Sequence, residues 1–261
     1  MIRLINFIKI LGLSRGRFKK VNNFILKRYL YKKKIRKISY KYYGKYFILY
    51  PLDNVTDNKI ITSSKKYDFK ELEYIKKLEK NNKSVFLDIG SNMGYYSIMS
   101  SNVGFTSIFA FEPLPKMISR IEENIKINNL EDKISIIPFA LGDENKQIII
   151  YEKIDNIGGS SILNDNKRSH NYRVNMITLN QFMKDYSLNH IDVLKIDIEG
   201  YEDRVLMPFF RNNNMSIFPK IVIIEHSSSK EWNEDVIDWM LKNGYSEEFK
   251  TRGNTILKFD I

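Results

Sequence analysis

The segment VFLDIGSNMGYYS, residues 85–97, decides how this chain folds. It begins as an uninterrupted apolar run, which is typical of a β-strand that is buried on both faces. Asp88 lies near the end of that run, and Gly90 and Gly94 follow in a loop that leads into a helical stretch. Strand, glycine-containing loop and helix in this order predict one unit of a parallel α/β sheet, whose ligands bind beyond the carboxyl ends of the strands. An ordinary turn that needs a positive φ explains the glycines equally well.

The sequence on either side of this segment repeats the alternation of strand and helix. Short apolar runs predict further strands at 107–111, 134–140, 193–198 and 220–225, with helical stretches at 94–102, 115–128, 200–212 and 230–243. Two more strands, at 245–250 and 255–260, close the chain and predict an antiparallel edge. We therefore expect a doubly wound α/β sheet, interrupted by a β-hairpin insertion at 146–180.

The first 81 residues depart from this alternation. Residues 1–33 have apolar and basic positions at helical spacing, which predicts a basic amphipathic segment. Residues 34–81 are predicted to be a lead-in that caps the main domain. It comprises strands at 35–42 and 46–50 and a helix at 68–81, with Asp68 as its N-cap. The main domain is then predicted to cover residues 82–261.

The positive charge of the chain is concentrated at one end. The formal net charge is +11, but residues 1–50 hold 15 Lys or Arg and no Asp or Glu, so the other 211 residues carry a net charge of −4. This distribution excludes a protein that coats nucleic acid with a uniformly basic surface. Three interpretations of the basic segment stay open: contact with an anionic membrane surface, contact with an acidic acceptor such as RNA or a charged polysaccharide precursor, and a solvated arm without a ligand.

The residue types that are rare or missing exclude several other classes of protein. The chain has no cysteine, which excludes a disulfide scaffold, a Cys-ligated zinc site, an iron–sulfur cluster and a thiol nucleophile. Its three histidines are widely spaced, so no histidine-rich metal site is expected. No apolar run approaches the roughly 20 residues of a membrane-spanning helix, and the N-terminus lacks the cleavage site of a signal peptide. We expect a cytoplasmic protein, and peripheral membrane contact through residues 1–33 is left open.

Carboxylates and apolar residues follow the ends of the next two predicted strands. Glu112 ends the second strand, 24 residues after Asp88, where an acid can accept both hydroxyls of a ribose. Phe139, Ala140 and Leu141 end the third and offer an apolar slot for a base. Together these residues predict a ligand that contains adenosine.

The fourth strand carries three ionisable residues in an otherwise apolar run. If the strand continues to residue 198, its alternation places Lys195, Asp197 and Glu199 on one face near the ligand. Burying such groups is costly unless they are paired or functional.

Four motifs in this order resemble the FkbM-type S-adenosylmethionine-dependent methyltransferases. They are DIGSNMG at 88–94, FEP at 111–113, ALGD at 140–143 and KIDIEGYE at 195–202. The resemblance covers residues 35–261 and leaves the basic segment outside. The chain departs from the family pattern at Asp68, where a glutamate is expected.

The resemblance implies a seven-stranded, Rossmann-like class I methyltransferase sheet and S-adenosylmethionine as the cofactor. The residues that would surround the methionine part of the cofactor are Asp88, Gly90, Asn92 and Gly94. Glu112 would bind the ribose, and the adenine would be flanked by Phe139, Ala140 and Leu141. Asp197 would lie beside the reactive sulfonium and the acceptor. The family implies O-methylation, commonly of sugars or other hydroxylated metabolites.

A sugar hydroxyl is a poor nucleophile, so a general base would accelerate the transfer by about 10²–10⁴-fold. Asp197 is the first candidate for this catalytic base by its position, and Glu199 and His226 follow. Pairing of Glu199 with Lys195, and a structural role for His226 at a strand end, explain these two residues equally well. No metal site is predicted; a divalent cation held by Asp197 and Glu199 is the alternative that the carboxylates leave open.

The predicted function is therefore an S-adenosylmethionine-dependent O-methyltransferase that acts on a hydroxyl of a sugar, a glycoconjugate or a similar metabolite. One alternative is an RNA methyltransferase that uses the basic N-terminus, although the acidic remainder of the chain speaks against it. Another is a catalytically silent, cofactor-binding membrane adaptor. The presence of Asp88, Glu112 and Asp197 together speaks against this adaptor.

Overall fold

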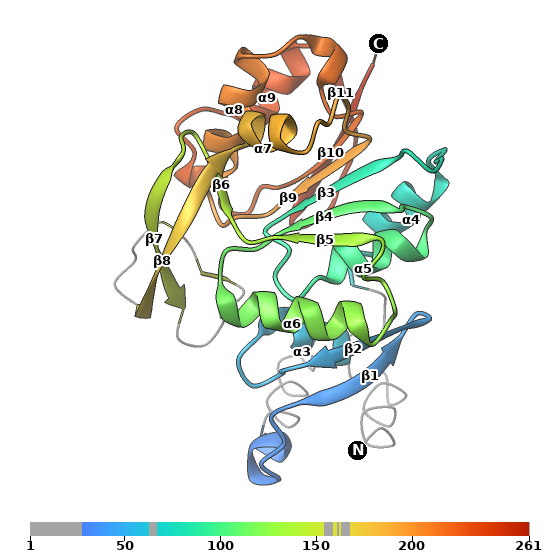
Figure 1. The fold of residues 1–261 in the computed structure, drawn as a ribbon, viewed down its shortest axis with the longest axis vertical. Helices are drawn as coiled ribbons and strands as arrows, with labels where there is room; N and C mark the ends of the chain where they lie inside the picture. The colour runs from blue at the N-terminus through green and yellow to red at the C-terminus, as the bar shows by residue number, and fades with distance from the viewer. Residues whose placement is uncertain (1–27, 63–66, 154–158, 161, 163–167, 261) are drawn as a thin grey trace.

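A central sheet of seven strands organises the molecule (Figure 1). The computed structural model describes residues 28–62, 67–153, 159–160, 162 and 168–260. The sheet contains β3 (Val85–Ile89), β4 (Ser107–Phe111), β5 (Ile134–Ile137), β9 (Val193–Ile196), β10 (Ile221–Glu225), β11 (Tyr245–Lys250) and β12 (Asn254–Phe259). Their order is β11-β12-β10-β9-β3-β4-β5, and β12 runs antiparallel to both of its neighbours. The predicted doubly wound sheet with an antiparallel edge is confirmed.

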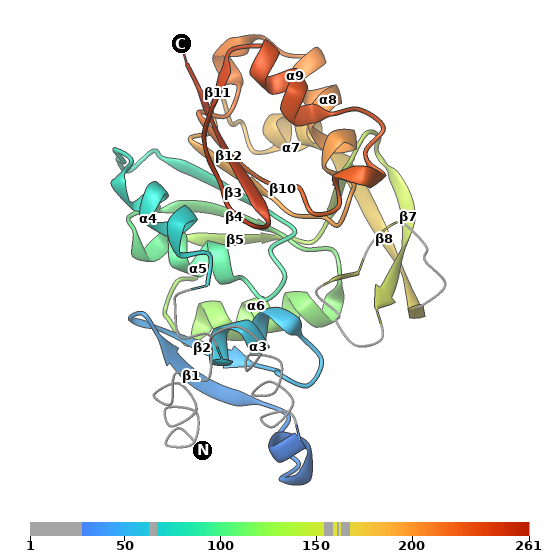
Figure 2. The ribbon, with the colours of Figure 1, turned by 180° about the vertical axis from the view of Figure 1, so that it is seen from behind.

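Helices cover both faces of this sheet (Figures 1 and 2). One layer contains α4 (Phe69–Lys77), α5 (Tyr95–Asn102) and α6 (Pro115–Lys126), and the other contains α7 (Leu179–Asp185), α8 (Glu202–Arg211) and α9 (Val236–Lys242). Alternate residues of β3 pack into different layers: Phe86 joins the first core cluster, and Val85 and Leu87 join the second. The strands are apolar throughout because both of their faces are buried. Two short 3₁₀ turns, η2 (Met215–Ile217) and η3 (Ser229–Glu231), follow α8 and β10 in the chain.

The chain order reverses beside β3, and this reversal places the site. β3 pairs with β4 on one side and with β9, which comes much later in the chain, on the other. Loops after these strands therefore turn in opposite directions and leave a crevice between them at the carboxyl ends.

The predicted strand 134–140 is wrong as a single element. β5 ends at Ile137, and Ala140–Gly142 form a separate strand, β6, in a second sheet of order β6-β8-β7. Pro138 follows Ile137 immediately and has no N–H with which to continue the ladder of β5. The other two strands of this sheet, β7 (Lys146–Lys153) and β8 (Arg168–Thr178), confirm the predicted hairpin insertion. Helix α7, which begins immediately after β8, was not predicted.

The lead-in forms a hairpin, whose strand β2 packs against α6, and two helices, of which α4 packs against α5 (Figure 2). The hairpin strands β1 (Ile38–Tyr42) and β2 (Lys45–Leu49) pair as predicted, but the following helix α3 (Val55–Thr62) was not predicted. Asp68 is the N-cap residue of α4, as predicted, but its side chain does not cap the helix. Asp68 has φ 44° and makes no side-chain cap bond to α4; its carboxylate instead accepts a hydrogen bond from the Tyr96 hydroxyl at 2.9 Å.

Most of the predicted basic segment, residues 1–27, lies outside the described residues. Among the residues that the structure describes, no helix is long and apolar enough to cross a membrane.

Candidate functional site

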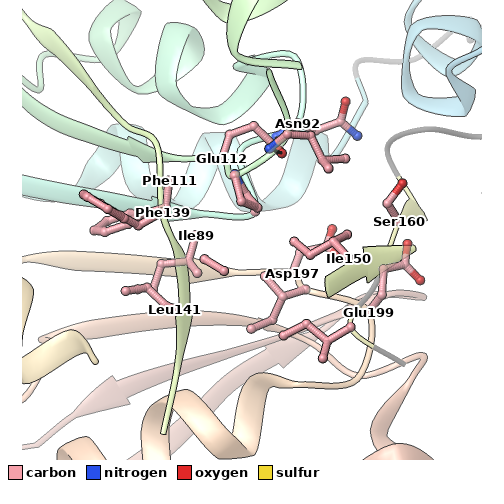
Figure 3. Close-up of a pocket in the computed structure, with 16 residues that line it drawn as sticks. Ile89, Asn92, Phe111, Glu112, Phe139, Leu141, Ile150, Ser160, Asp197 and Glu199 are labelled. Carbon is pink, nitrogen blue, oxygen red and sulfur yellow. Dashed lines mark hydrogen bonds between the residues drawn. The ribbon is translucent and has the colours of Figure 1, made fainter. Parts of the chain in front are cut away.

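A cavity lies at the carboxyl ends of β3, β4 and β9, where the sheet order reverses (Figure 3). Its wall includes eight predicted site residues from four separate segments. They are Gly90, Asn92, Glu112, Phe139, Ala140, Leu141, Asp197 and Glu199. The hairpin insertion closes one side with Ile150, Ser160 and Ile162.

Gly90 brings two strand ends into direct contact. Its backbone N–H donates to the carbonyl of Phe111 at 3.1 Å, and its φ is +75°. A Cβ built on Gly90 would lie 2.0 Å from the carbonyl oxygen of Asp197, closer than any real side chain allows. Only glycine therefore permits the loop after β3 to approach the end of β9.

The rest of the glycine-containing loop orients its neighbours. Asn92 has φ +55° and lines the cavity. Gly94 has φ +83° and precedes the first residue of α5. It is not among the described residues that line the cavity, so the structure assigns it to the turn that starts the helix.

Glu112 presents a buried carboxylate to the cavity. Its side chain accepts hydrogen bonds from the backbone N–H groups of Asn92 and Leu114, each at 3.0 Å. The residue is only 6% exposed, and burial raises its pKa to about 7. In Figure 3 it lies on the same side of the cavity as Asn92, facing the apolar side chains across from it. A carboxylate held in this way can accept hydrogen bonds from a vicinal diol such as a ribose.

Apolar residues form the opposite end of the cavity. Phe139 follows the short break after β5, and Ala140 and Leu141 lie in β6. The break at Pro138 thus directs this segment away from the main sheet and across the strand ends. The result is a slot of the kind that accommodates a flat base.

A second, more polar cavity adjoins the first and shares Gly90, Asn92 and Asp197 with it. Asp88 and Lys195, neighbours in the β3–β9 register, line it from the sheet. Its remaining wall comes from the lead-in and α5: Thr56, Tyr67, Ser91, Tyr95 and Tyr96.

Asp88 is fully buried, and only one of its carboxylate oxygens is satisfied. Its Oδ2 accepts hydrogen bonds from the backbone N–H and the hydroxyl of Ser97, at 2.9 and 2.6 Å. Its Oδ1 has no hydrogen-bond partner among the described residues, and burial raises the pKa of the group. Such an oxygen is costly unless a ligand donates to it.

Lys195 is the positive charge of the second cavity. Its Nζ lies 3.4 Å from the Asp197 carboxylate and 5.2 Å from the centre of the Tyr96 ring. Burial lowers the pKa of Lys195, but the charges of Asp197 and Asp88 more than offset this, so the pKa is raised. The ammonium is therefore held charged inside the protein. The carboxylates Asp88, Asp197 and Glu112 outnumber it around the two cavities, which suits a positively charged ligand such as a sulfonium.

The prediction that Lys195, Asp197 and Glu199 share one strand face is wrong in its geometry. β9 ends at Ile196, so Asp197 lies at the strand tip, and Glu199 lies in the following turn with φ +56°. Both side chains nevertheless border the first cavity (Figure 3). Because the chain turns after Ile196, strand alternation no longer determines the direction of the Glu199 side chain.

In the part of the chain that the structure describes, His226 lines neither of the two cavities. It follows β10, and its Nδ1 lies 2.9 Å from the hydroxyl oxygen of Thr255. Its backbone N–H donates to the carbonyl of Gly253 at 2.9 Å. These contacts join the end of β10 to β12.

A cluster of carboxylates lies behind Asp197, but it does not include Glu199. One oxygen each of Asp197, Glu202 and Glu225 lie within 4.8 Å of one another. Glu202 accepts hydrogen bonds from the N–H of Ile198 at 2.8 Å and from the Trp232 indole at 2.7 Å. The carboxylate of Glu225 accepts hydrogen bonds from the backbone N–H groups that follow it. Through these hydrogen bonds Glu202 stabilises the turn after β9, and Glu225 stabilises the turn after β10.

Sequence reasoning missed the part of the second cavity's wall that comes from the lead-in and α5. Thr56 lies on a helix that was not predicted, and its position gives no signal of a site. Tyr67 and Tyr96 are aromatic residues that a sequence cannot distinguish from core residues. Lys195 did carry a signal, as an ionisable residue within a buried strand.

The sheet order and the cavity beyond the strand ends define a Rossmann-like class I methyltransferase architecture. The family model of the methyltransferase FkbM domain matches residues 88–247, which is more than half of the chain. The chain therefore belongs to the FkbM family of S-adenosylmethionine-dependent methyltransferases.

Individual relatives are distant. Methyltransferase 1 of Beauveria bassiana (strain ARSEF 2860) is 24% identical over 143 residues, which are 47% of this chain and 57% of that protein. The crystal structure of an FkbM methyltransferase from Methylobacillus flagellatus KT has a TM-score of 0.47 and 16% identity, and the alignment covers 78% of this chain and 52% of that one. A putative rRNA-methylase from Clostridium thermocellum has a TM-score of 0.48 and 10% identity, with 76% and 97% covered. The chain thus spans little more than half the length of the first two proteins.

Proposed function

We propose that this chain transfers the methyl group of S-adenosylmethionine to a hydroxyl of a sugar, a glycoconjugate or a similar metabolite. The observation that carries the proposal is the position of Asp197, which borders both cavities at the point where they meet. The apolar cavity fits adenosine, through Glu112 and the slot at residues 139–141. The polar cavity fits the methionine end, because the orphaned Asp88 oxygen accepts an ammonium and Lys195 attracts a carboxylate.

The residues present therefore fit the cofactor. When bound, it supplies a methyl group on a positively charged sulfur. Asp197 is held 3.4 Å from Lys195, and its side chain is 35% exposed, so an acceptor can reach it. We assign it the removal of the proton from the acceptor hydroxyl. Alignment of the acceptor would supply much of the remaining acceleration, because methyl transfer is an in-line displacement.

Asp197→Asn is expected to lower kcat by about a hundredfold, because the amide keeps the shape of the side chain but accepts no proton. The measurement is transfer of labelled methyl groups to a panel of sugars and glycoconjugates, alongside calorimetric titration with S-adenosylhomocysteine. The Kd for this product is expected to change much less than kcat, since Glu112 and the apolar slot are untouched.

Glu199→Gln and His226→Gln are the comparison variants, because both residues are alternative candidates for the base. If either variant lost a hundredfold in kcat while Asp197→Asn stayed active, the substituted residue and not Asp197 would be the general base. Methylation of RNA in place of every hydroxylated small molecule would overturn the proposed acceptor class.

We also propose that the basic N-terminus lies against an anionic membrane surface. Among the described residues of this region, Arg28, Lys32, Lys33 and Lys34 are exposed, as is Tyr31 at 79%. Each basic residue near such a surface contributes about 1 kcal/mol. The full chain is expected to float with vesicles that contain anionic lipid, and a chain without residues 1–33 is expected to stay in the soluble fraction. Equal flotation of the two chains would contradict the proposed contact between the basic N-terminus and the membrane surface.

A further inference from the structure

A buried side chain of the lead-in contacts the glycine-containing loop after β3. This side chain lies outside residues 88–247, the region that matches the family model. Asn54 precedes α3 and is 1% exposed. Its Nδ2 donates to the side-chain oxygen of Asn92 at 2.7 Å, while its own Oδ1 accepts from the N–H of Thr56 at 2.9 Å. The bond to Thr56 fixes which end of the Asn54 amide faces the loop. Asn54 therefore presents a donor to Asn92, and Asn92 must present its oxygen.

Asn92 transmits this contact to the site. Its φ of +55° is a left-handed conformation, which asparagine adopts more readily than most residues but less readily than glycine, so contacts with its neighbours help to hold it. In this conformation its backbone N–H donates to Glu112 at 3.0 Å. One residue thus connects the lead-in to the carboxylate assigned to the ribose.

The lead-in does not need Asn54 for its own attachment. Asp53 accepts two hydrogen bonds from the guanidinium of Arg120, at 2.9 and 2.8 Å, which ties the lead-in to α6. Asn128 holds β2 to α6 by accepting from the N–H of Tyr46 at 2.8 Å and donating to its carbonyl. The side chain of Asn54, by contrast, contacts the loop itself.

We propose that Asn54 is a positioning residue for the cofactor. It holds Asn92 in the left-handed conformation and thereby keeps Glu112 aimed into the cavity. The inference rests on the proposed cofactor site. It gives the lead-in a role in binding, in addition to its role as a cap on the fold.

The first test is calorimetric titration of the full chain with S-adenosylhomocysteine. Asn54→Ala is expected to raise the Kd about tenfold, as the loss of one buried hydrogen bond and of the restraint on Asn92 implies. Asn128→Ala is the matched control: it removes an asparagine that anchors the same lead-in without touching the loop, and its Kd is expected to stay within about twofold of wild type. Equal Kd values for the two variants would overturn the proposal.

A second test separates positioning from a loss of stability. Glycine adopts positive φ without strain, so in the Asn92→Gly variant the loop keeps its left-handed turn without the hydrogen bond from Asn54. In that background, Asn54→Ala is expected to change the Kd by less than about twofold, and a full tenfold change there would contradict the mechanism. Asn92→Ala removes the same bond and leaves the Thr56 contact intact; it provides the measurement if Asn54→Ala does not fold, and an unchanged Kd would again overturn the proposal. A wild-type chain that binds no S-adenosylhomocysteine would instead refute the proposed cofactor site.

Discussion

Gly90→Ala is expected to abolish binding of S-adenosylhomocysteine and to lower the stability of the fold. The added Cβ would lie 2.0 Å from the backbone carbonyl oxygen of Asp197, and no side-chain rotation can relieve that overlap. The residue also has φ +75°, which disfavours alanine by itself. The loop after β3 would have to move away from β9, and both cavities include this contact. Calorimetry and thermal unfolding of the variant measure the two effects.

Gly253→Ala is the matched control for this substitution. Among the described residues, a Cβ on Gly253 would meet only the Ser227 hydroxyl, at 3.8 Å, which is ordinary contact. Its Kd and melting temperature are expected to remain close to wild type. If Gly90→Ala bound the product as tightly as Gly253→Ala, the close approach of the two strand ends would not be needed for the site.

Glu112→Ala is expected to weaken binding of S-adenosylhomocysteine by at least about a hundredfold. A hydrogen bond to a charged acceptor contributes about 1.5–3 kcal/mol, and a ribose offers two such hydroxyls. The substitution also leaves the N–H groups of Asn92 and Leu114 without their acceptor. Calorimetric titration measures the loss. Glu144→Ala provides the control, because that exposed glutamate pairs with Lys146 away from the cavity lining.

The pH dependence of binding gives an independent check on Glu112. Its pKa of about 7, raised by burial, means that the group is largely ionised at pH 8 and largely protonated at pH 6. The Kd is therefore expected to rise about tenfold between pH 8 and pH 6, and Glu112→Gln should lack this dependence. The effect on stability has the opposite sign. Because the folded pKa lies above the ordinary value, the stability that Glu112 contributes is present below about pH 4 and is lost as the pH rises through 7. A wild-type Kd that does not change with pH would exclude ionised Glu112 from binding.

The sequence determined the parts of this protein that depend on local chemistry. The apolar runs of β3, β4, β9 and β10 predict buried parallel strands because a strand covered on both faces has no polar side. The left-handed turn at Gly90 and the carboxylate at Glu112 follow from short motifs at strand ends. Motifs of this kind predicted eight of the sixteen residues that line the first cavity.

How distant segments meet depends on tertiary packing that the sequence patterns do not reveal. The end of β9 and the strained turn at Glu199 depend on the hydrogen bonds of Glu202, which no periodicity reveals. His226 follows β10 in the sequence, yet its ring contacts Thr255 instead of the cavity. The contact of Asn54 with Asn92 joins residues 38 positions apart, and it forms because the lead-in packs beside α6. Long-range contacts of this kind depend on packing, and packing is a property of the whole fold.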